Sequence, residues 1–137
     1  AWAQTIYWPL LHASKYGRGT ALRPIVQSPA YDCSDYTDVP LLDATATLGD
    51  DGSLTIFAVN RDLEEDIELT CDLRAFGELR PAEHILLHHD DVKAVNTEDQ
   101  PDTVSPQKGG HGKVDGGYFT IRVPALSWNV IRLEKAE

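Results

Sequence analysis

The strongest constraint on the fold is an alternation of apolar and polar residues that begins near residue 20. LLDATATL at 41–48 and DIELTCDL at 66–73 both alternate, as strands with one buried face do. Between them LTIFAVN at 54–60 is apolar on both faces, which is typical of a central strand. Further strands are expected over 20–27, 82–89, 118–123 and 128–133. Because turn signals separate these runs, we predict about seven strands in an antiparallel β-sandwich.

Two polar stretches interrupt this pattern. Residues 28–40 are predicted to form a loop, and residues 90–117 form a long excursion rich in Asp, Gly and Pro. A loop of that length in a small domain indicates a function or an ordered surface segment. The run KGGHGK at 108–113 within it is interpreted as a mobile loop.

The first 19 residues have a different character and are expected to form a short helix. Thr5 is a candidate N-cap, Pro9 falls in the first turn, and Gly17 and Gly19 are stop signals. A helix this short and rich in aromatic residues is marginal alone, so it needs a surface to pack against.

Composition limits the possible partners. Twelve Lys and Arg face 22 Asp and Glu, and the resulting net charge of −10 opposes binding to nucleic acid or anionic lipid. No run approaches the roughly 20 apolar residues of a membrane helix. The chain has no Met and starts at Ala1, so we expect a cut or processed N-terminus. Cys71 is predicted to be a buried free thiol, which fits a reducing compartment.

No catalytic constellation is evident from residue 20 onward. His84 and His88, in EHILLHHDD at 83–91, are interpreted as a polar cluster at a strand end, with a metal site as the less favoured alternative. Glu64-Glu65 and Asp90-Asp91 are adjacent carboxylates that we expect in solvated turns. There is no G-x-S-x-G motif, and KGGHGK lacks the Walker spacing. We therefore nominate no catalytic residue, metal ligand or cofactor here.

The pattern W-x-Q-T-I-Y-x-P-x-x-x-H-A-S-x-Y-G-R-G, from Trp2 to Gly19, resembles the end of the catalytic barrel in the α-L-arabinofuranosidases of glycoside hydrolase family 51. SPAYDCSDYTDVPLLDATA, EHILLHHDDVKAVNT and LSWNVIRLE extend the resemblance over nearly the whole chain. It implies a mainly β fold, with a jelly-roll-like antiparallel β-sandwich at 20–137. Residues 1–19 would be the last loop and helix of a (β/α)8 barrel, left joined to it.

The resemblance also implies a role for two residues near the N-terminus. Gln4 would hydrogen-bond the arabinofuranosyl unit, and Trp2 would line the same pocket. The family is retaining, and its two catalytic glutamates come from earlier barrel strands, so neither lies in this chain. The implied protein is an exo-enzyme that releases terminal arabinose from arabinan, arabinoxylan and their oligosaccharides, and this piece of it is expected to be structural and inactive alone.

The implied partners are the arabinose-containing substrate, the missing barrel and further copies in a homo-oligomer, a hexamer by resemblance. We expect a cytoplasmic protein that binds neither nucleic acid nor membrane. A first strand contributed from before the barrel would also be missing, which predicts an unpaired sheet edge. The alternative is a non-catalytic carbohydrate-binding or interaction module that contacts glycans through Trp128, Tyr118 or Tyr36. Trp128 is otherwise expected to pack in the core or at a domain interface.

Overall fold

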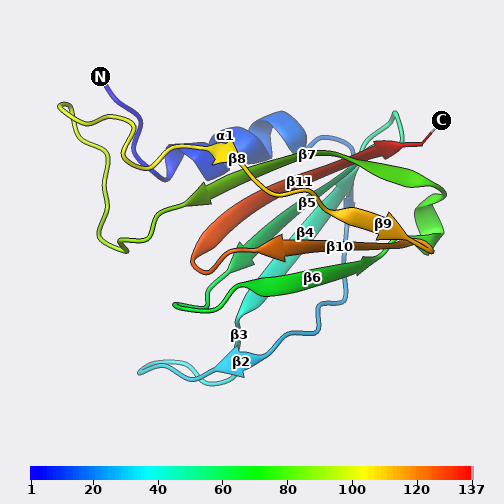
Figure 1. The fold of residues 1–137 in the computed structure, drawn as a ribbon, viewed down its shortest axis with the longest axis horizontal. Helices are drawn as coiled ribbons and strands as arrows, with labels where there is room; N and C mark the ends of the chain where they lie inside the picture. Colours follow the sequence, from blue (N-terminus) through cyan, green and yellow to red (C-terminus); the bar gives the residue numbers. More distant parts are fainter. Residues whose placement is uncertain (137) are drawn as a thin grey trace.

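The computed structural model describes residues 1–136, which form an antiparallel β-sandwich with one α-helix near the N-terminus (Figure 1). Helix α1 spans Tyr7–Tyr16, and a single 3-10 turn, η1, spans Arg74–Phe76. The strands are β1 (Thr20–Leu22), β2 (Ala30–Tyr31), β3 (Val39–Pro40), β4 (Leu42–Leu48), β5 (Leu54–Asn60), β6 (Ile67–Asp72), β7 (Leu79–His88), β8 (Gln107–Lys108), β9 (Lys113–Asp115), β10 (Tyr118–Val123) and β11 (Ser127–Lys135).

The strands form two main sheets and a small ribbon. The larger sheet has the order β1-β4-β5-β11-β7-β8, and the smaller one has the order β6-β10-β9. β2 and β3 pair only with each other, at the far end of the molecule from α1 in Figure 1. All paired strands run antiparallel. The predicted antiparallel sandwich is thereby confirmed.

The core lies between the two sheets. From the smaller sheet, Phe119, Ile121 and Val123 of β10 are each at most 3% exposed. They belong to one apolar cluster with Ile56 and Ile131 of the larger sheet. Burying a large apolar side chain contributes roughly 1.5–3 kcal/mol, so this cluster is the main source of stability.

The alternation in the sequence correctly predicts which strand faces are buried. Every residue of β5 is buried except Val59, which is half-buried, as expected of a strand apolar on both faces. On β6 the side chain of Leu69 is buried and its neighbours Glu68 and Thr70 are exposed. Cys71 is only half-buried, because β6 is the outer strand of its sheet. It is a free thiol, and its burial raises its pKa to about 11.

Several expected boundaries are wrong. The first strand ends at Leu22 instead of residue 27, because Pro24 cannot donate to a ladder. The two predicted loops contain short strands: β2 and β3 in residues 28–40, and β8 and β9 in residues 90–117. These strands have two or three residues each, which is too short for periodicity to reveal them.

The segment KGGHGK is packed against the sandwich, contrary to the mobile loop expected from its glycines. Lys108 pairs with Ile85 of β7, and the N–H of Gly109 donates to the carbonyl of His84 at 2.8 Å. A Cβ on Gly112 would collide with the ring of Phe119. Glycine is therefore required here for close approach of the backbone to a buried side chain.

The free edge of β6 borders an apolar cavity of about 610 Å³. Its lining includes Leu42 and Ile56 from the larger sheet and Leu69 from β6. The segment Arg23–Gln27 also borders it, and Ile25 in this segment is 94% exposed. The sandwich thus has an unpaired edge beside an open apolar space within residues 1–136. As for membranes, no helix in that part of the chain is long and apolar enough to cross one.

Candidate functional site

Gln4 lies in the segment that leads into α1, and its backbone helps to start the helix. Its carbonyl accepts the N–H of Tyr7 at 2.9 Å, and the carbonyl of Thr5 accepts the N–H of Trp8 at 3.3 Å. The N-cap position is Ile6, which makes no side-chain cap, so the prediction that the Thr5 side chain caps the helix is wrong. Gln4 is exposed, and within residues 1–136 its side-chain amide makes no hydrogen bond. That amide is available to a polar ligand.

Trp2 is held by the long polar excursion. Its side chain is 41% exposed, and its indole N–H donates to the carbonyl of Asn96 at 3.0 Å. The structure therefore brings Trp2 together with Asn96, a residue that the sequence analysis did not single out. No pattern distinguishes Asn96 from the other polar residues around it, so only the tertiary contact reveals its importance. In Figure 1 the N-terminal segment lies beside the yellow loop that carries the later part of the excursion.

Helix α1 docks on the larger sheet through His12. The imidazole is 5% exposed, and its Nδ1 accepts the indole N–H of Trp128 on β11 at 3.1 Å. Trp128 also stacks on Phe57 of β5, with ring centroids 5.7 Å apart. The expectation that Trp128 packs within the protein is confirmed. The guanidinium of Arg132 lies 4.7 Å above the ring of Tyr16, the last residue of the helix.

Burial lowers the pKa of His12 below its ordinary value of 6.5, and the positive charge of Lys15 lowers it further. The carboxylate of Glu83 on β7 acts in the opposite direction. The hydrogen bond from Trp128 requires an unprotonated Nδ1, so geometry and electrostatics both favour a neutral ring.

The opposite face of α1 is apolar and exposed. Ile6 and Leu10 are 70% and 66% exposed, and Tyr7 and Leu11 are 46% and 36% exposed. A short helix that buries one face on a sheet and leaves a second apolar face open has room for a further packing partner.

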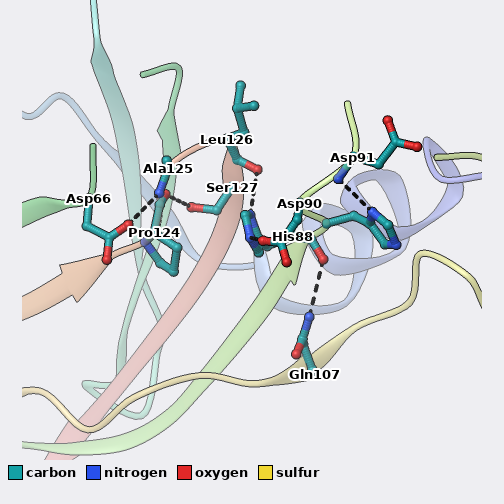
Figure 2. Close-up of polar contacts among 10 residues, drawn as sticks. Asp66, His88, Asp90, Asp91, Gln107, Pro124, Ala125, Leu126 and Ser127 are labelled. Atoms are coloured by element: carbon teal, nitrogen blue, oxygen red, sulfur yellow. Dashed lines mark hydrogen bonds and ion pairs between the residues drawn. The ribbon is translucent and has the colours of Figure 1, made fainter. Parts of the chain in front are cut away.

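The polar cluster at the end of β7 is a set of structural contacts (Figure 2). His88 lies between two acceptors, the carbonyl of Leu126 at 3.3 Å from Nδ1 and a carboxylate oxygen of Asp90 at 3.0 Å from Nε2. The side-chain amide of Gln107 donates to the carbonyl of His88 at 3.2 Å, which holds the excursion against β7. The backbone N–H of Asp91 donates to the imidazole of His89.

His84, four residues earlier, belongs to a buried network in the larger sheet. Its Nε2 lies 2.8 Å from Oδ1 of Asn129, whose amide nitrogen donates to Ser127 and to the carbonyl of Ala58. The amide orientation therefore makes His84 the donor at Nε2. Ser127 donates in turn to the carbonyl of Pro124 at 2.6 Å. These side chains hydrogen-bond to one another inside the sheet, and His84 also borders a cavity of about 520 Å³.

The adjacent acidic residues Glu64-Glu65 and Asp90-Asp91 are all exposed. Glu64 and Glu65 are exposed, and their backbone N–H groups both donate to Asp62, which makes this segment the solvated turn expected from the sequence. No group of three His, Cys, Asp or Glu in residues 1–136 could hold a metal ion.

The fold and the contacts define an antiparallel β-sandwich domain that carries, at its N-terminal end, a docked helix with one exposed apolar face. A family model described as "Alpha-L-arabinofuranosidase C-terminal domain" matches residues 1–127. The chain therefore belongs to the α-L-arabinofuranosidase C-terminal domain family.

Curated relatives match the chain over almost its full length. It is 46% identical over 136 residues to "Intracellular exo-alpha-(1->5)-L-arabinofuranosidase 1" of Bacillus subtilis (strain 168). The matched region covers 98% of this chain and 27% of that protein. It is 42% identical over 136 residues to "Intracellular exo-alpha-(1->5)-L-arabinofuranosidase" of Acetivibrio thermocellus, with the same two coverages. The chain thus spans about a quarter of the length of these relatives.

Solved structures show the same fold. A family 51 α-L-arabinofuranosidase from Bifidobacterium longum superposes with a TM-score of 0.87 and 34% identity, over 97% of this chain and 26% of that one. The GH51 arabinofuranosidase from Xanthomonas axonopodis pv. citri superposes with a TM-score of 0.70 and 26% identity, over 79% of this chain and 22% of that one.

Proposed function

We propose that the chain is the C-terminal part of a retaining exo-α-L-arabinofuranosidase. The longer protein would release terminal non-reducing α-L-arabinofuranosyl units from arabinan, arabinoxylan and their oligosaccharides. Family membership is the observation that carries this proposal, together with relatives that are named exo-arabinofuranosidases and are about four times as long.

In this proposal residues 1–19 are the last loop and helix of a catalytic barrel, and residues 20–137 are the sandwich that braces it. The exposed apolar face of α1 supports this division, because the barrel would bury Ile6 and Leu10. The nucleophile and the acid/base glutamate would come from the rest of the barrel.

Gln4 would contact the sugar. The segment before the last helix of such a barrel lies at the catalytic end of the strands, where active sites are built. An amide can donate to one ring hydroxyl and accept from another. Because the Gln4 amide is exposed and makes no hydrogen bond within residues 1–136, it can do both. The indole N–H of Trp2 donates to the carbonyl of Asn96, so it is not free to bind the sugar. Trp2 would instead line the same pocket with the exposed part of its ring.

We further propose a cytoplasmic location, which the word "intracellular" in the names of the bacterial relatives supports. We also expect a homo-oligomer, with a hexamer as the first assembly to look for. The unpaired edge of β6 would then be covered by another part of the longer protein or by a neighbouring subunit.

The test compares the full-length protein with residues 1–137 alone on 4-nitrophenyl α-L-arabinofuranoside. The full-length protein should turn the substrate over and the isolated chain should not. In the full-length protein Gln4→Ala should lower kcat/KM roughly ten- to a hundredfold, the effect of losing one or two hydrogen bonds to the substrate. Turnover by the isolated chain, or an undiminished kcat/KM in the variant, would contradict the proposal.

The alternative, a carbohydrate-binding module, has less support. Trp128 is packed beneath α1, Tyr118 lies on β10 of the other sheet, and Tyr36 lies between β2 and β3. Two of these aromatic residues come from different sheets and the third from a loop, so they do not share one sheet face. Titration of residues 1–137 with arabinan oligosaccharides distinguishes the two: affinity that survives Gln4→Ala would support the module.

A further inference from the structure

Asn96 is a buried polar residue in the long excursion, and its side chain is used almost completely. It is 3% exposed. The amide nitrogen donates to the carbonyl of Ala3 at 3.0 Å and to the carbonyl of Val104 at 2.8 Å. The amide oxygen accepts the N–H of Val104 at 2.7 Å. Only an amide offers two donors and an acceptor from one short side chain, so an aspartate or serine could not replace it.

The backbone of Asn96 adds a second connection to the N-terminal segment, because its carbonyl accepts the indole N–H of Trp2. Two consecutive residues, Trp2 and Ala3, are thus tied to one residue more than 90 positions away in sequence. Gln4 comes directly after them, and on its other side its own carbonyl accepts the N–H of Tyr7. The backbone that carries the Gln4 amide is fixed on both sides.

The excursion itself is shaped to hold Asn96 in place. Its two bonds to Val104, which is 6% exposed, close the loop of residues 97–103. Within that loop the N–H of Thr97 donates to the carbonyl of Gln100 at 3.1 Å. The excursion is therefore a folded strap whose buried end contacts the segment before α1.

We propose that Asn96 is a positioning residue that fixes the segment bearing Gln4, so that the sandwich domain sets the geometry of the sugar contact. This inference rests on the proposed function, in which Gln4 binds the arabinofuranosyl unit. In this inference the sandwich does more than brace the barrel, because Asn96 holds a residue that binds the substrate.

A double-mutant cycle in the full-length protein tests the proposal. Asn96→Ala should lower kcat/KM roughly ten- to a hundredfold, the size of effect that a misplaced binding group produces. If Asn96 acts through Gln4, the double variant Gln4→Ala/Asn96→Ala should be no more than about threefold worse than Gln4→Ala alone. Losses that multiply would overturn the proposal, because a merely structural effect is independent of Gln4.

Asn60 supplies a matched control. It is 1% exposed, and its amide donates to the carbonyls of Glu65 and Val123 and accepts the N–H of Asp62, the same set of bonds that Asn96 makes. These bonds lie within the sandwich and involve no residue of the N-terminal segment. At a temperature where thermal melts show each variant folded, Asn60→Ala should retain wild-type kcat/KM. A loss equal to that of Asn96→Ala would overturn the proposal.

The outcomes also separate this inference from the function on which it rests. If Gln4→Ala leaves kcat/KM unchanged, the proposed sugar contact is wrong, and this inference is wrong with it. If Gln4→Ala impairs turnover and Asn96→Ala does not, only the positioning role is overturned. Should Asn96→Ala fail to fold, Asn96→Ser takes its place in the cycle, because its uncharged hydroxyl can satisfy part of the buried polar groups but cannot donate to the carbonyls of Ala3 and Val104 together.

Discussion

The indole N–H of Trp128 on β11 donates to Nδ1 of His12 on α1, 3.1 Å away, and this bond joins the helix to the sandwich. An Nδ1 that accepts a hydrogen bond carries no proton, so the bond exists only with a neutral imidazole. The docking of α1 is thereby linked to the protonation of a single buried histidine.

The first prediction concerns pH. Burial and the charge of Lys15 lower the pKa of His12, against the opposing effect of Glu83. A lowered pKa means that the unfolded chain binds the proton more readily, so the stabilisation is fully present above about pH 6.5 and is lost as the pH falls below it. Loss of one hydrogen bond, about 1 kcal/mol, would lower the melting temperature by roughly 2–5 °C.

The measurement is a series of thermal melts between pH 8 and pH 5. His12→Asn is the control, because its amide oxygen can accept the Trp128 bond and cannot be protonated in this range. The variant should show a smaller fall in melting temperature than the wild type. Asp62 and Asp66 do not contribute to the pH dependence measured between pH 8 and pH 5. Hydrogen bonds lower the pKa of both carboxyls below 3.8, so both stay ionised over this range. Equal slopes for the two proteins would contradict the prediction.

The second prediction compares Trp128, which contacts α1 from the sheet, with Trp8, which belongs to α1. Trp128→Phe removes the donor to His12 and leaves a buried acceptor unpaired, whereas Trp8→Phe removes an indole N–H that has no partner within residues 1–136. The first change should therefore destabilise the chain by about 1–3 kcal/mol more than the second. Urea unfolding of both variants measures the difference, and equal losses would show that the bond contributes nothing.

Strand periodicity in the sequence was sufficient to predict the sandwich, because long strands with one buried face must alternate. LTIFAVN became the buried strand β5, and DIELTCDL became β6 with Leu69 inside. The two-residue strands β2, β3 and β8 were missed, because pairing partners far away in sequence create them and no local pattern does. The packed glycine segment was missed for the same reason.

The candidate site was only partly predictable. Gln4 and Trp2 were predicted from a motif that resembles a family, and the structure places both in the segment before α1. The structural role of Asn96 could not be predicted from the sequence, since an asparagine in a polar loop is ordinarily solvated. Its burial follows from contacts with Ala3 and Val104 that exist only in the folded chain.

The third prediction addresses the glycines of the packed loop. A methyl group on Gly112 would collide with the ring of Phe119, which is fully buried in the core and cannot move aside. Gly112→Ala should cost about 1–3 kcal/mol through overpacking. Gly110→Ala is the matched control, because within residues 1–136 no atom beyond its chain neighbours lies within 4 Å of the added Cβ, and it should change stability by less than about 0.5 kcal/mol. Chemical denaturation that shows equal effects at the two positions would mean that the loop is not packed as described.

The last prediction tests what the exposed face of α1 is for. Leu10 is 66% exposed, so Leu10→Gln should change the stability of residues 1–137 alone by less than about 0.5 kcal/mol. In the full-length protein the same side chain would be buried against the barrel, and the change should cost about 1–3 kcal/mol. Leu63→Gln, at a leucine 72% exposed in the turn between β5 and β6, is the control and should be neutral in the isolated chain. Thermal melts of both forms give the comparison. If Leu10→Gln is as mild in the full-length protein as in the isolated chain, the helix does not pack against a barrel, and the division of the chain at residue 19 is wrong.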